Sequence, residues 1–136
     1  MKYYDDTVVA VDNTNINLIY KFVNFAGSSL KSFRYFDSRL PEEAIKKHIK
    51  TLVIIRSGIP HGYAHLDNDG DNIWLGLCVA EKSKGLGLGK RLMEEILKYK
   101  PKDRSLTLSV DADNHIAIKL YHKFGFSNKI IIMDSQ

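Results

Sequence analysis

The fold is decided by the stretch Ile73-Trp-Leu-Gly-Leu-Cys-Val79, Ala-Glu-Lys-Ser83, Lys84-Gly-Leu-Gly-Leu-Gly89-Lys90. Its first part is apolar enough to form a strand that is buried on both faces. Beyond it, apolar residues recur at helical spacing: Leu88, Leu92, Met93, Ile96 and Leu97. Three alternating glycines let a ligand approach the backbone closely, and a helix N-terminus follows with unpaired N–H groups and a positive dipole end. The stretch therefore predicts an anion site, and phosphate is the commonest anion held in this way.

Spacing excludes two familiar phosphate motifs. A nucleoside-triphosphate loop needs Gly, four residues and then Gly-Lys-Ser/Thr. Gly89-Lys90 fits the later pair, but position 84 is Lys and position 91 is Arg. A dinucleotide fingerprint, G-x-G-x-x-G, would place its third glycine on Lys90 or on Leu92. The phosphate ligand is therefore expected to be of another kind.

Length and composition indicate one soluble domain over residues 1–136. The chain is 44% hydrophobic and 26% charged, and it contains no apolar run of roughly 18 residues, so no membrane contact is expected. The N-terminus does not resemble a signal peptide, and Cys78 is the one cysteine, so the cytoplasm is the expected compartment. The net charge is +4, but the basic residues are scattered, which argues against a nucleic-acid partner.

Hydrophobic periodicity predicts the order of the elements. Strands are expected at 7–11, 52–56, 61–66, 73–79, 105–110 and 126–133, and helices up to Gly27, from Pro41 to about Lys50, from Lys90, and from Asp113 or Asn114 to Lys123. Residues 28–40 are expected to be irregular. A helical crossover makes strands 73–79 and 105–110 parallel. The pattern predicts an α/β fold, a mixed sheet with helices on both faces.

Two motifs resemble those of the GCN5-related N-acetyltransferase (GNAT) family. The pattern Leu77-x-Val79, four residues, Lys84-x-x-Gly87-x-Gly89 resembles the family's coenzyme-A-binding motif, with Lys84 where Arg or Gln is usual. The stretch 114–126 resembles N-x-x-A-x-x-x-Y-x-x-x-G-F and matches it at every fixed position. The resemblance implies a mostly antiparallel sheet with a splayed parallel strand pair. It also implies an acetyl-CoA site formed by Leu77, Val79, Lys84, Gly85, Leu86, Gly87, Leu88, Gly89, Lys90, Asn114 and Tyr121.

The resemblance also implies roles for particular residues. Asn114 would hydrogen-bond the pantetheine arm, and Tyr121 would act as general acid toward the departing thiolate; without the motif, Tyr121 would be read as a core tyrosine beside Phe124. A physical argument supports the cofactor site. If the two parallel strands splay, the main-chain groups of Leu77 and Val79 are left unpaired, and the amides of a pantetheine arm can satisfy them. A free N–H near Val79 could also polarise the thioester carbonyl.

The two motifs do not assign the residues that bind and deprotonate the acceptor amine. His65 and Asp67 share one strand face and are candidate bases, and a water-exposed polar pair at the strand end is the alternative. Arg34, Tyr35 and Arg39 are candidates for binding the acceptor, and a loop anchored by Phe33 and Phe36 is the alternative. The stretch Asp67-Asn-Asp-Gly-Asp71 opens like a calcium loop but lacks the later Glu, so a hairpin turn is favoured and no metal is expected.

Together these features predict an enzyme that moves acetyl from acetyl-CoA to a primary amine by direct attack in a ternary complex. A small-molecule acceptor such as an amino sugar is favoured. The alternatives are a non-catalytic acyl-CoA-binding regulatory module and an acetyltransferase acting on a protein or peptide amine. Only ten residues follow Phe126, where the family often has two strands, so a homodimer that covers the exposed edge is a further expectation.

Overall fold

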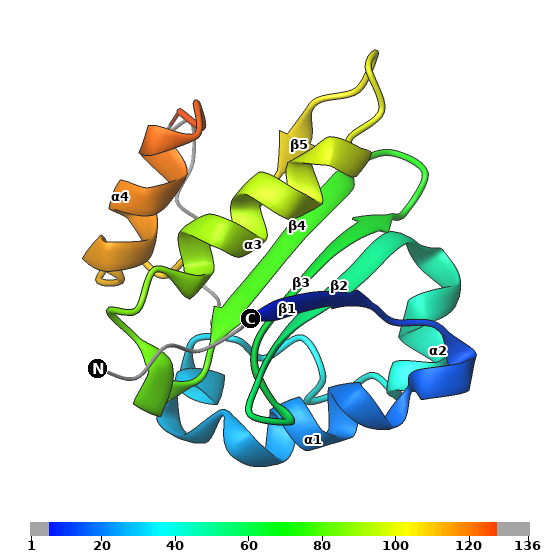
Figure 1. Ribbon diagram of the computed structural model, residues 1–136. Helices are drawn as coiled ribbons and strands as arrows, with labels where there is room; N and C mark the ends of the chain where they lie inside the picture. Colours follow the sequence, from blue (N-terminus) through cyan, green and yellow to red (C-terminus); the bar gives the residue numbers. More distant parts are fainter. Residues whose placement is uncertain (1–5, 128–136) are drawn as a thin grey trace.

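A computed structural model describes residues 6–127 of the chain. One five-stranded sheet, in the order β1-β2-β3-β4-β5, separates two layers of helices (Figure 1). The strands are β1 (Thr7–Ala10), β2 (His48–Arg56), β3 (Ile59–Asn68), β4 (Ile73–Val79) and β5 (Leu106–Thr107). The α-helices are α1 (Asn17–Phe25), α2 (Pro41–Ala44), α3 (Leu88–Ile96) and α4 (His115–Lys123). Strands β1 to β4 form an antiparallel meander, and β4 pairs with β5 in parallel, as the mixed-sheet prediction requires.

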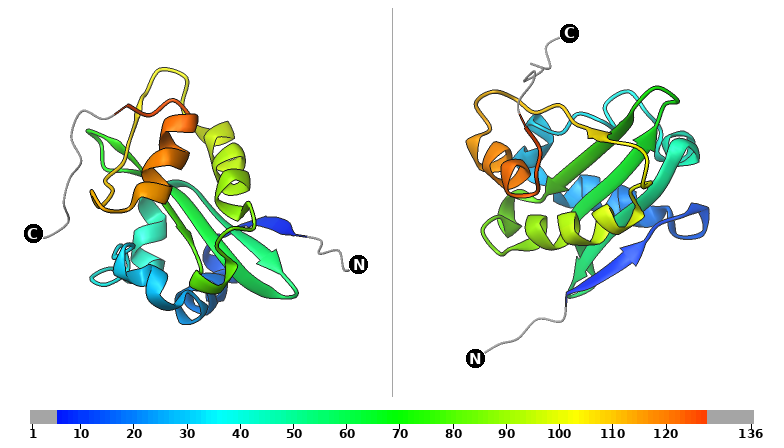
Figure 2. Two further views of the ribbon diagram at one scale, coloured as in Figure 1. Left: turned by 90° about the vertical axis from the view of Figure 1, so that its left-hand side faces the viewer. Right: turned by 90° about the horizontal axis from the view of Figure 1, so that it is seen from above.

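Alternation along the strands divides the core into two clusters, one on each face of the sheet. Leu52, Ile54, Ala64 and Leu66 face α3 and Tyr121 of α4, whereas Val53, Tyr63 and Cys78 face α1. Figure 2 shows α3 and α4 on one side of the sheet and α1 on the other. Within residues 6–127, no helix is both long and apolar enough to cross a membrane.

Two predicted elements differ from the structure. The helix expected from Pro41 to about Lys50 ends at Ala44, a 3-10 turn follows (Ile45–Lys47), and His48 already pairs with Asp67 of β3. The reason is tertiary: β3 is long enough to pair with three more residues before Leu52, namely His48, Lys50 and Thr51. The strand expected at 105–110 is paired only at Leu106 and Thr107. Leu108 and Val110 still pack against the α3 core, so their alternation reflects burial without ladder hydrogen bonds.

Smaller shifts affect the remaining boundaries. Helix α3 begins at Leu88, two residues before the expected start. The β2–β3 hairpin turns at Ser57 and Gly58, both at positive φ (52° and 78°), as a two-residue turn requires. The strand expected at 126–133 falls mostly outside the described residues.

Candidate active site

The outer edge of β4 is open where the two parallel strands part. Ala80 N–H donates to the His61 carbonyl at 2.8 Å, so hydrogen bonds to β3 fall on alternate residues and the main chain of Leu77 and Val79 faces away from β3. On that side β5 pairs only as far as Trp74. In the described residues no strand covers Leu77 and Val79, which is the splayed geometry expected from the sequence.

One group on this edge is not open, contrary to expectation. Ser29 Oγ, from the 3-10 helix Gly27–Lys31, donates to the Val79 carbonyl at 2.7 Å. The prediction that the main-chain groups of Val79 are all unpaired is therefore wrong for its carbonyl oxygen. Ser29 lies 50 residues from Val79 in the sequence, so this contact is not part of a local motif.

The glycine loop is shaped for close approach by an anion. Gly85 and Gly87 adopt φ of 82° and 79°, which L-residues rarely adopt, and no atom lies within 4 Å of where their Cβ atoms would stand. Gly87 is the N-cap residue of α3, and Lys84 and Lys90 are exposed beside it. Two glycines at positive φ, a helix N-terminus and two exposed cations therefore lie at one turn, an arrangement that suits an anion.

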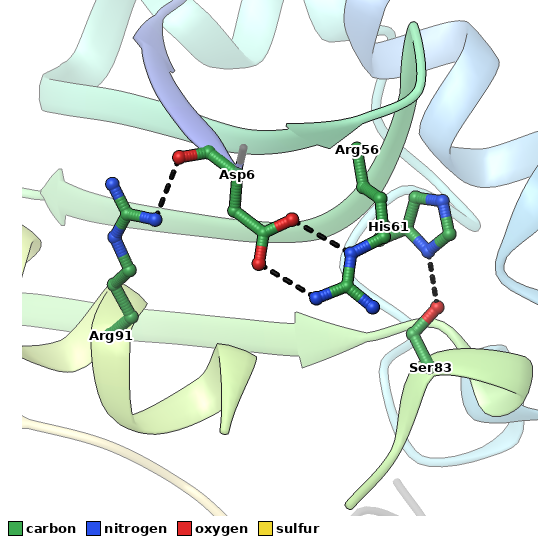
Figure 3. Close-up of polar contacts among 5 residues, drawn as sticks. All are labelled: Asp6, Arg56, His61, Ser83 and Arg91. Carbon is green, nitrogen blue, oxygen red and sulfur yellow. Dashed lines mark hydrogen bonds and ion pairs between the residues drawn. The ribbon is translucent and has the colours of Figure 1, made fainter. Parts of the chain in front are cut away.

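Side chains from other elements hold this loop and helix in place (Figure 3). Ser83, buried just before the loop, lies 2.5 Å from His61 Nδ1 in a hydrogen bond. Arg91 of α3 donates to the Asp6 carbonyl, and the Asp6 carboxylate accepts two 2.7 Å hydrogen bonds from Arg56 of β2. The start of α3 is thus connected through Asp6 to β2, and the segment before the glycine loop is connected to β3 through His61.

Helix α4 places Tyr121 beside this edge. Its side chain is 9% exposed, and its ring packs edge-on against Phe126 at 6.0 Å between centroids. Burial, with a smaller contribution from Cys78, raises the pKa of Tyr121 to about 12, so the phenol keeps its proton. Asn114 caps α4, accepting from Ala117 N–H at 3.4 Å. Ile116, in the first turn of α4, is 83% exposed.

The two candidate bases are both buried, so the water-exposed alternative is wrong. His65 is 1% exposed, its Nδ1 lies 2.7 Å from Tyr63 Oη, and its pKa is held well below the usual range, first by burial and then by His48 and Arg39. Asp67 is 8% exposed and its Oδ2 accepts from Tyr35 Oη at 2.6 Å. Its Oδ1 is buried and has no hydrogen-bond partner within residues 6–127. Of the two side chains, Asp67 is the one with an unpaired acceptor atom.

The candidate acceptor-binding residues already form contacts within the protein. Tyr35 donates to Asp67, and both arginines bind other groups. Arg34 forms an ion pair with Asp111 at 3.1 Å, and it also donates to the Lys31 carbonyl. Arg39 donates to the Tyr35 carbonyl at 2.9 Å, and its guanidinium carbon lies 4.3 Å from the centre of the Tyr35 ring. Arg39 therefore helps to hold Tyr35, which in turn contacts Asp67.

One cavity of about 1640 Å³ joins these parts. Its lining includes the glycine-loop residues Lys84, Gly85, Gly87, Leu88, Gly89 and Lys90, the edge residues Leu77 and Val79, the helix residues Asn114 and Tyr121, and His65, Asp67, Arg34, Tyr35 and Arg39. Leu86, which is 50% exposed, is the one predicted site residue outside this lining. Sequence reasoning did not identify three residues that contact the site or line its cavity: Ser29, Trp74 and His48. Their signals are weak, because Ser29 and Trp74 belong to no motif and His48 lies in a segment that reads as helix.

The chemistry of the cavity favours group transfer without a covalent enzyme intermediate. Cys78 is buried, and burial raises the pKa of its thiol to about 12, so it is a poor nucleophile. Within the described part of the chain, no three His, Cys, Asp or Glu side chains are grouped closely enough to hold a metal ion. The lining of the cavity does include the glycine loop, the protonated phenol of Tyr121, and Asp67, whose Oδ1 has no hydrogen-bond partner within residues 6–127.

Comparisons with known proteins agree with this description. The model of the Acetyltransferase (GNAT) family matches residues 17–126. The structure of YncA from Salmonella typhimurium with its cofactor acetyl-CoA aligns with a TM-score of 0.73 at 19% identity, covering 93% of this chain and 82% of that one. The ribosomal-protein-S18-alanine N-acetyltransferase from Escherichia coli aligns with a TM-score of 0.69 at 23% identity, covering 93% and 80%. At these identities the likeness establishes the fold, and the predicted fold class is confirmed.

One curated relative is more similar in sequence but over a short stretch. The 5-NmdU N-acetyltransferase of Pseudomonas phage PaMx11 is 45% identical over 49 residues, which are 36% of this chain. The match spans about a third of that relative, 34% of its length.

Proposed function

The chain belongs to the Acetyltransferase (GNAT) family, as the two sequence motifs indicated, and we propose that it transfers acetyl from acetyl-CoA to a primary amine of a small molecule. One observation carries the proposal: the glycine loop at the start of α3, Tyr121 and Asp67 all line a single cavity, and Asp67 Oδ1 has no hydrogen-bond partner within residues 6–127. An acyl-CoA needs the first two, and an amine that must lose a proton needs the third. The proposed enzyme is a single domain over residues 1–136.

The donor is proposed to lie along the open edge of β4. The backbone N–H groups after Lys84 and at the start of α3 receive the pyrophosphate, with Lys84 and Lys90 adding positive charge. The pantetheine arm runs past Leu77 and Val79, whose open main-chain groups accept its amides as a neighbouring strand would. Only an N–H group can donate to the thioester oxygen, so the N–H groups on this edge are its proposed partners, while Ser29 Oγ donates to the Val79 carbonyl. Asn114 is the proposed side-chain partner of the arm.

The reaction is proposed as one direct displacement. The amine nitrogen attacks the thioester carbonyl carbon and the carbon–sulfur bond breaks. Tyr121 donates its proton to the departing thiolate, and the proton that the new amide nitrogen loses restores the phenol. Asp67 takes the proton that the ammonium must lose, because its Oδ1 has no hydrogen-bond partner within residues 6–127, whereas burial and the Tyr63 contact make His65 a weaker candidate. Arg34, Tyr35 and Arg39 shape the acceptor end.

The acceptor is proposed to be a small molecule that enters the cavity beside Asp67. The cavity lining there comes from β3 and from the segment before α2, which carries both Arg34 and Arg39. The phage relative is named for an activity on 5-NmdU, so this compound belongs among the candidates together with amino sugars. The expected homodimer and the cytoplasmic location both stay predictions, and sedimentation at micromolar concentration tests the first.

The test is release of CoA thiol from acetyl-CoA across a panel that contains amino sugars, 5-NmdU and a lysine peptide. Turnover on a small amine that is lost in Asp67→Asn and reduced in Tyr121→Phe supports the proposal. Turnover restricted to the peptide contradicts the small-molecule assignment. Tight CoA binding by calorimetry without turnover on any amine contradicts the enzyme and favours a CoA-binding module.

A further inference from the structure

Four side chains form a continuous line of hydrogen bonds that ends at the cavity. Thr51 Oγ1 lies 2.7 Å from His48 Nδ1, His48 Nε2 lies 2.8 Å from Tyr35 Oη, and Tyr35 Oη lies 2.6 Å from Asp67 Oδ2. The line crosses from β2 to the segment before α2 and on to β3. Thr51 is 2% exposed, so the far end of the line is closed to solvent.

The carboxylate sets the direction of every bond in this line. A carboxylate only accepts, so Tyr35 must donate its proton to Asp67, and its oxygen is then left to accept from His48 Nε2–H. With the proton on Nε2, His48 Nδ1 carries a lone pair and accepts from the Thr51 hydroxyl. A neutral imidazole is required for this arrangement. Burial of His48, with Arg39 acting in the same direction and Asp67 opposing, lowers the pKa of its ring to about 4.

The line uses one oxygen of Asp67 and leaves the other without a partner. An unsatisfied buried acceptor is normally costly, since a group taken out of water loses its hydrogen bonds. Here Oδ1 belongs to a residue that lines the cavity, so the missing partner can be a ligand. The other side chains around Asp67 are aromatic. The ring centroids of Tyr35 and His65 lie 4.2 Å apart, and Trp74 is the residue opposite Asp67 in the β3–β4 pair.

We propose that His48 and Thr51 are positioning residues of the acceptor site, which hold Tyr35 against Asp67 Oδ2 and so present Oδ1 to the ammonium group of the acceptor. The proposal rests on the proposed function and adds to it the side chains that position Asp67 for the acceptor. The acceptor enters as a cation, and a hydrogen-bonding neutral analogue of the same size binds weakly, because a buried carboxylate prefers a charged donor.

Trp74 provides a readout that does not need turnover. It is the chain's one tryptophan, it lines the cavity, and in the antiparallel pair its side chain shares a face with Asp67. The probe is n-propylammonium chloride, with n-propanol as the neutral analogue, titrated into the CoA-loaded protein while the Trp74 indole N–H resonance is followed. Saturable shifts with propylammonium and at least tenfold weaker ones with propanol are expected; equal responses to the two probes overturn the proposal.

Two variants distinguish the effect of the Asp67 carboxylate on propylammonium binding from the effect of other negative charge in the cavity. Asp67→Asn should abolish the response to propylammonium. Asp37→Asn removes an exposed carboxylate that lines the same cavity, and it should leave the response unchanged. If Asp37→Asn reduces the response to propylammonium as much as Asp67→Asn does, the response reports the general charge of the cavity, and the proposal is wrong.

A matched pair tests the far end of the line. Thr51→Val keeps the β-branched shape but removes the hydroxyl, whereas Thr51→Ser keeps the hydroxyl. Propylammonium should bind roughly three- to tenfold more weakly to Thr51→Val and as in wild type to Thr51→Ser, with equal melting temperatures confirming that both fold. Equal affinities in the two variants contradict the positioning role. Because this readout needs no acetyl transfer, it can succeed even if no amine on the panel is acetylated, and it can fail while turnover is normal.

Discussion

The imidazole of His65 lies directly over Gly76. The two residues pair across β3 and β4, and a Cβ built on Gly76 would stand 2.4 Å from His65 Cε1 and 2.5 Å from Nε2. Real Cβ atoms do not approach other atoms so closely, so the ring occupies space that only glycine leaves open. Because His65 is fully enclosed and bonded to Tyr63, it cannot swing aside freely. The glycine in the centre of β4 is therefore a packing requirement of the site.

Gly76→Ala is expected to destabilise the protein by about 1–3 kcal/mol, the usual range for overpacking a buried position. The measurement is the free energy of urea unfolding. Gly89→Ala is the matched control, because its Cβ would meet Leu120 Cδ2 at a tolerable 3.4 Å and alanine favours a helix. Destabilisation of Gly89→Ala by as much as Gly76→Ala would show that the loss is not specific to the His65 contact.

Gly87→Glu is expected to lower CoA affinity by roughly a hundredfold, about 2.7 kcal/mol, because it places bulk and negative charge at the proposed pyrophosphate site. Gly70→Glu is the control: Gly70 also has a positive φ (97°) and open space around it, but it lies in the β3–β4 hairpin. Both variants should lose similar stability from backbone strain. Calorimetry with CoA separates them, and unchanged affinity in Gly87→Glu would remove the glycine loop from the site.

The parts of the site that could be predicted from sequence are those encoded by local spacing. The glycine loop and the helix after it are predicted from residues that are close together in the sequence. Asn114 and Tyr121 likewise occur within one short motif. What could not be predicted depends on partners distant in sequence. Ser29 reaches the Val79 carbonyl across 50 residues. His48 lies among Glu and Lys residues that complement a helix dipole, yet pairing with β3 makes it a strand residue that contacts Tyr35.

Tyr121→Phe is expected to reduce kcat by roughly ten- to a hundredfold while the KM for acetyl-CoA stays the same, since only the hydrogen bond to the departing thiolate is lost. The pKa of Tyr121 is raised to about 12, so the wild-type phenol stays protonated throughout the accessible pH range. The wild-type rate should therefore show no alkaline fall near pH 10, the ordinary range of a tyrosine. Rates measured from pH 7 to 10.5 test this, and an alkaline limb present in wild type but absent in Tyr121→Phe would show that the phenol ionises earlier.

His48 is expected to make the fold less stable in mild acid. Its pKa falls from an ordinary value of 6.5 to about 4 in the folded protein, mainly through burial, so between these values the unfolded chain binds a proton that the folded chain does not. The free energy of unfolding should therefore fall as the pH drops from 6.5 toward 4, by at most about 1.4 kcal/mol per pH unit for this one group. His65, whose pKa is also lowered, adds a contribution of the same sign.

The groups that face His48 come from three segments: Thr51 on β2, Tyr35 and Arg39 in the segment before α2, and Asp67 and His65 on β3. Replacing His48 with Gln removes the titrating ring and keeps a side-chain donor toward Tyr35. Urea unfolding at pH 7.0, 6.0 and 5.0 should then show a shallower loss of stability in His48→Gln than in wild type. His115→Gln, at an exposed position of α4 outside this network, should follow the wild type. If His48→Gln loses stability as steeply as wild type over this range, His48 is not the group that titrates, and the line from Thr51 to Asp67 is not held by a neutral imidazole.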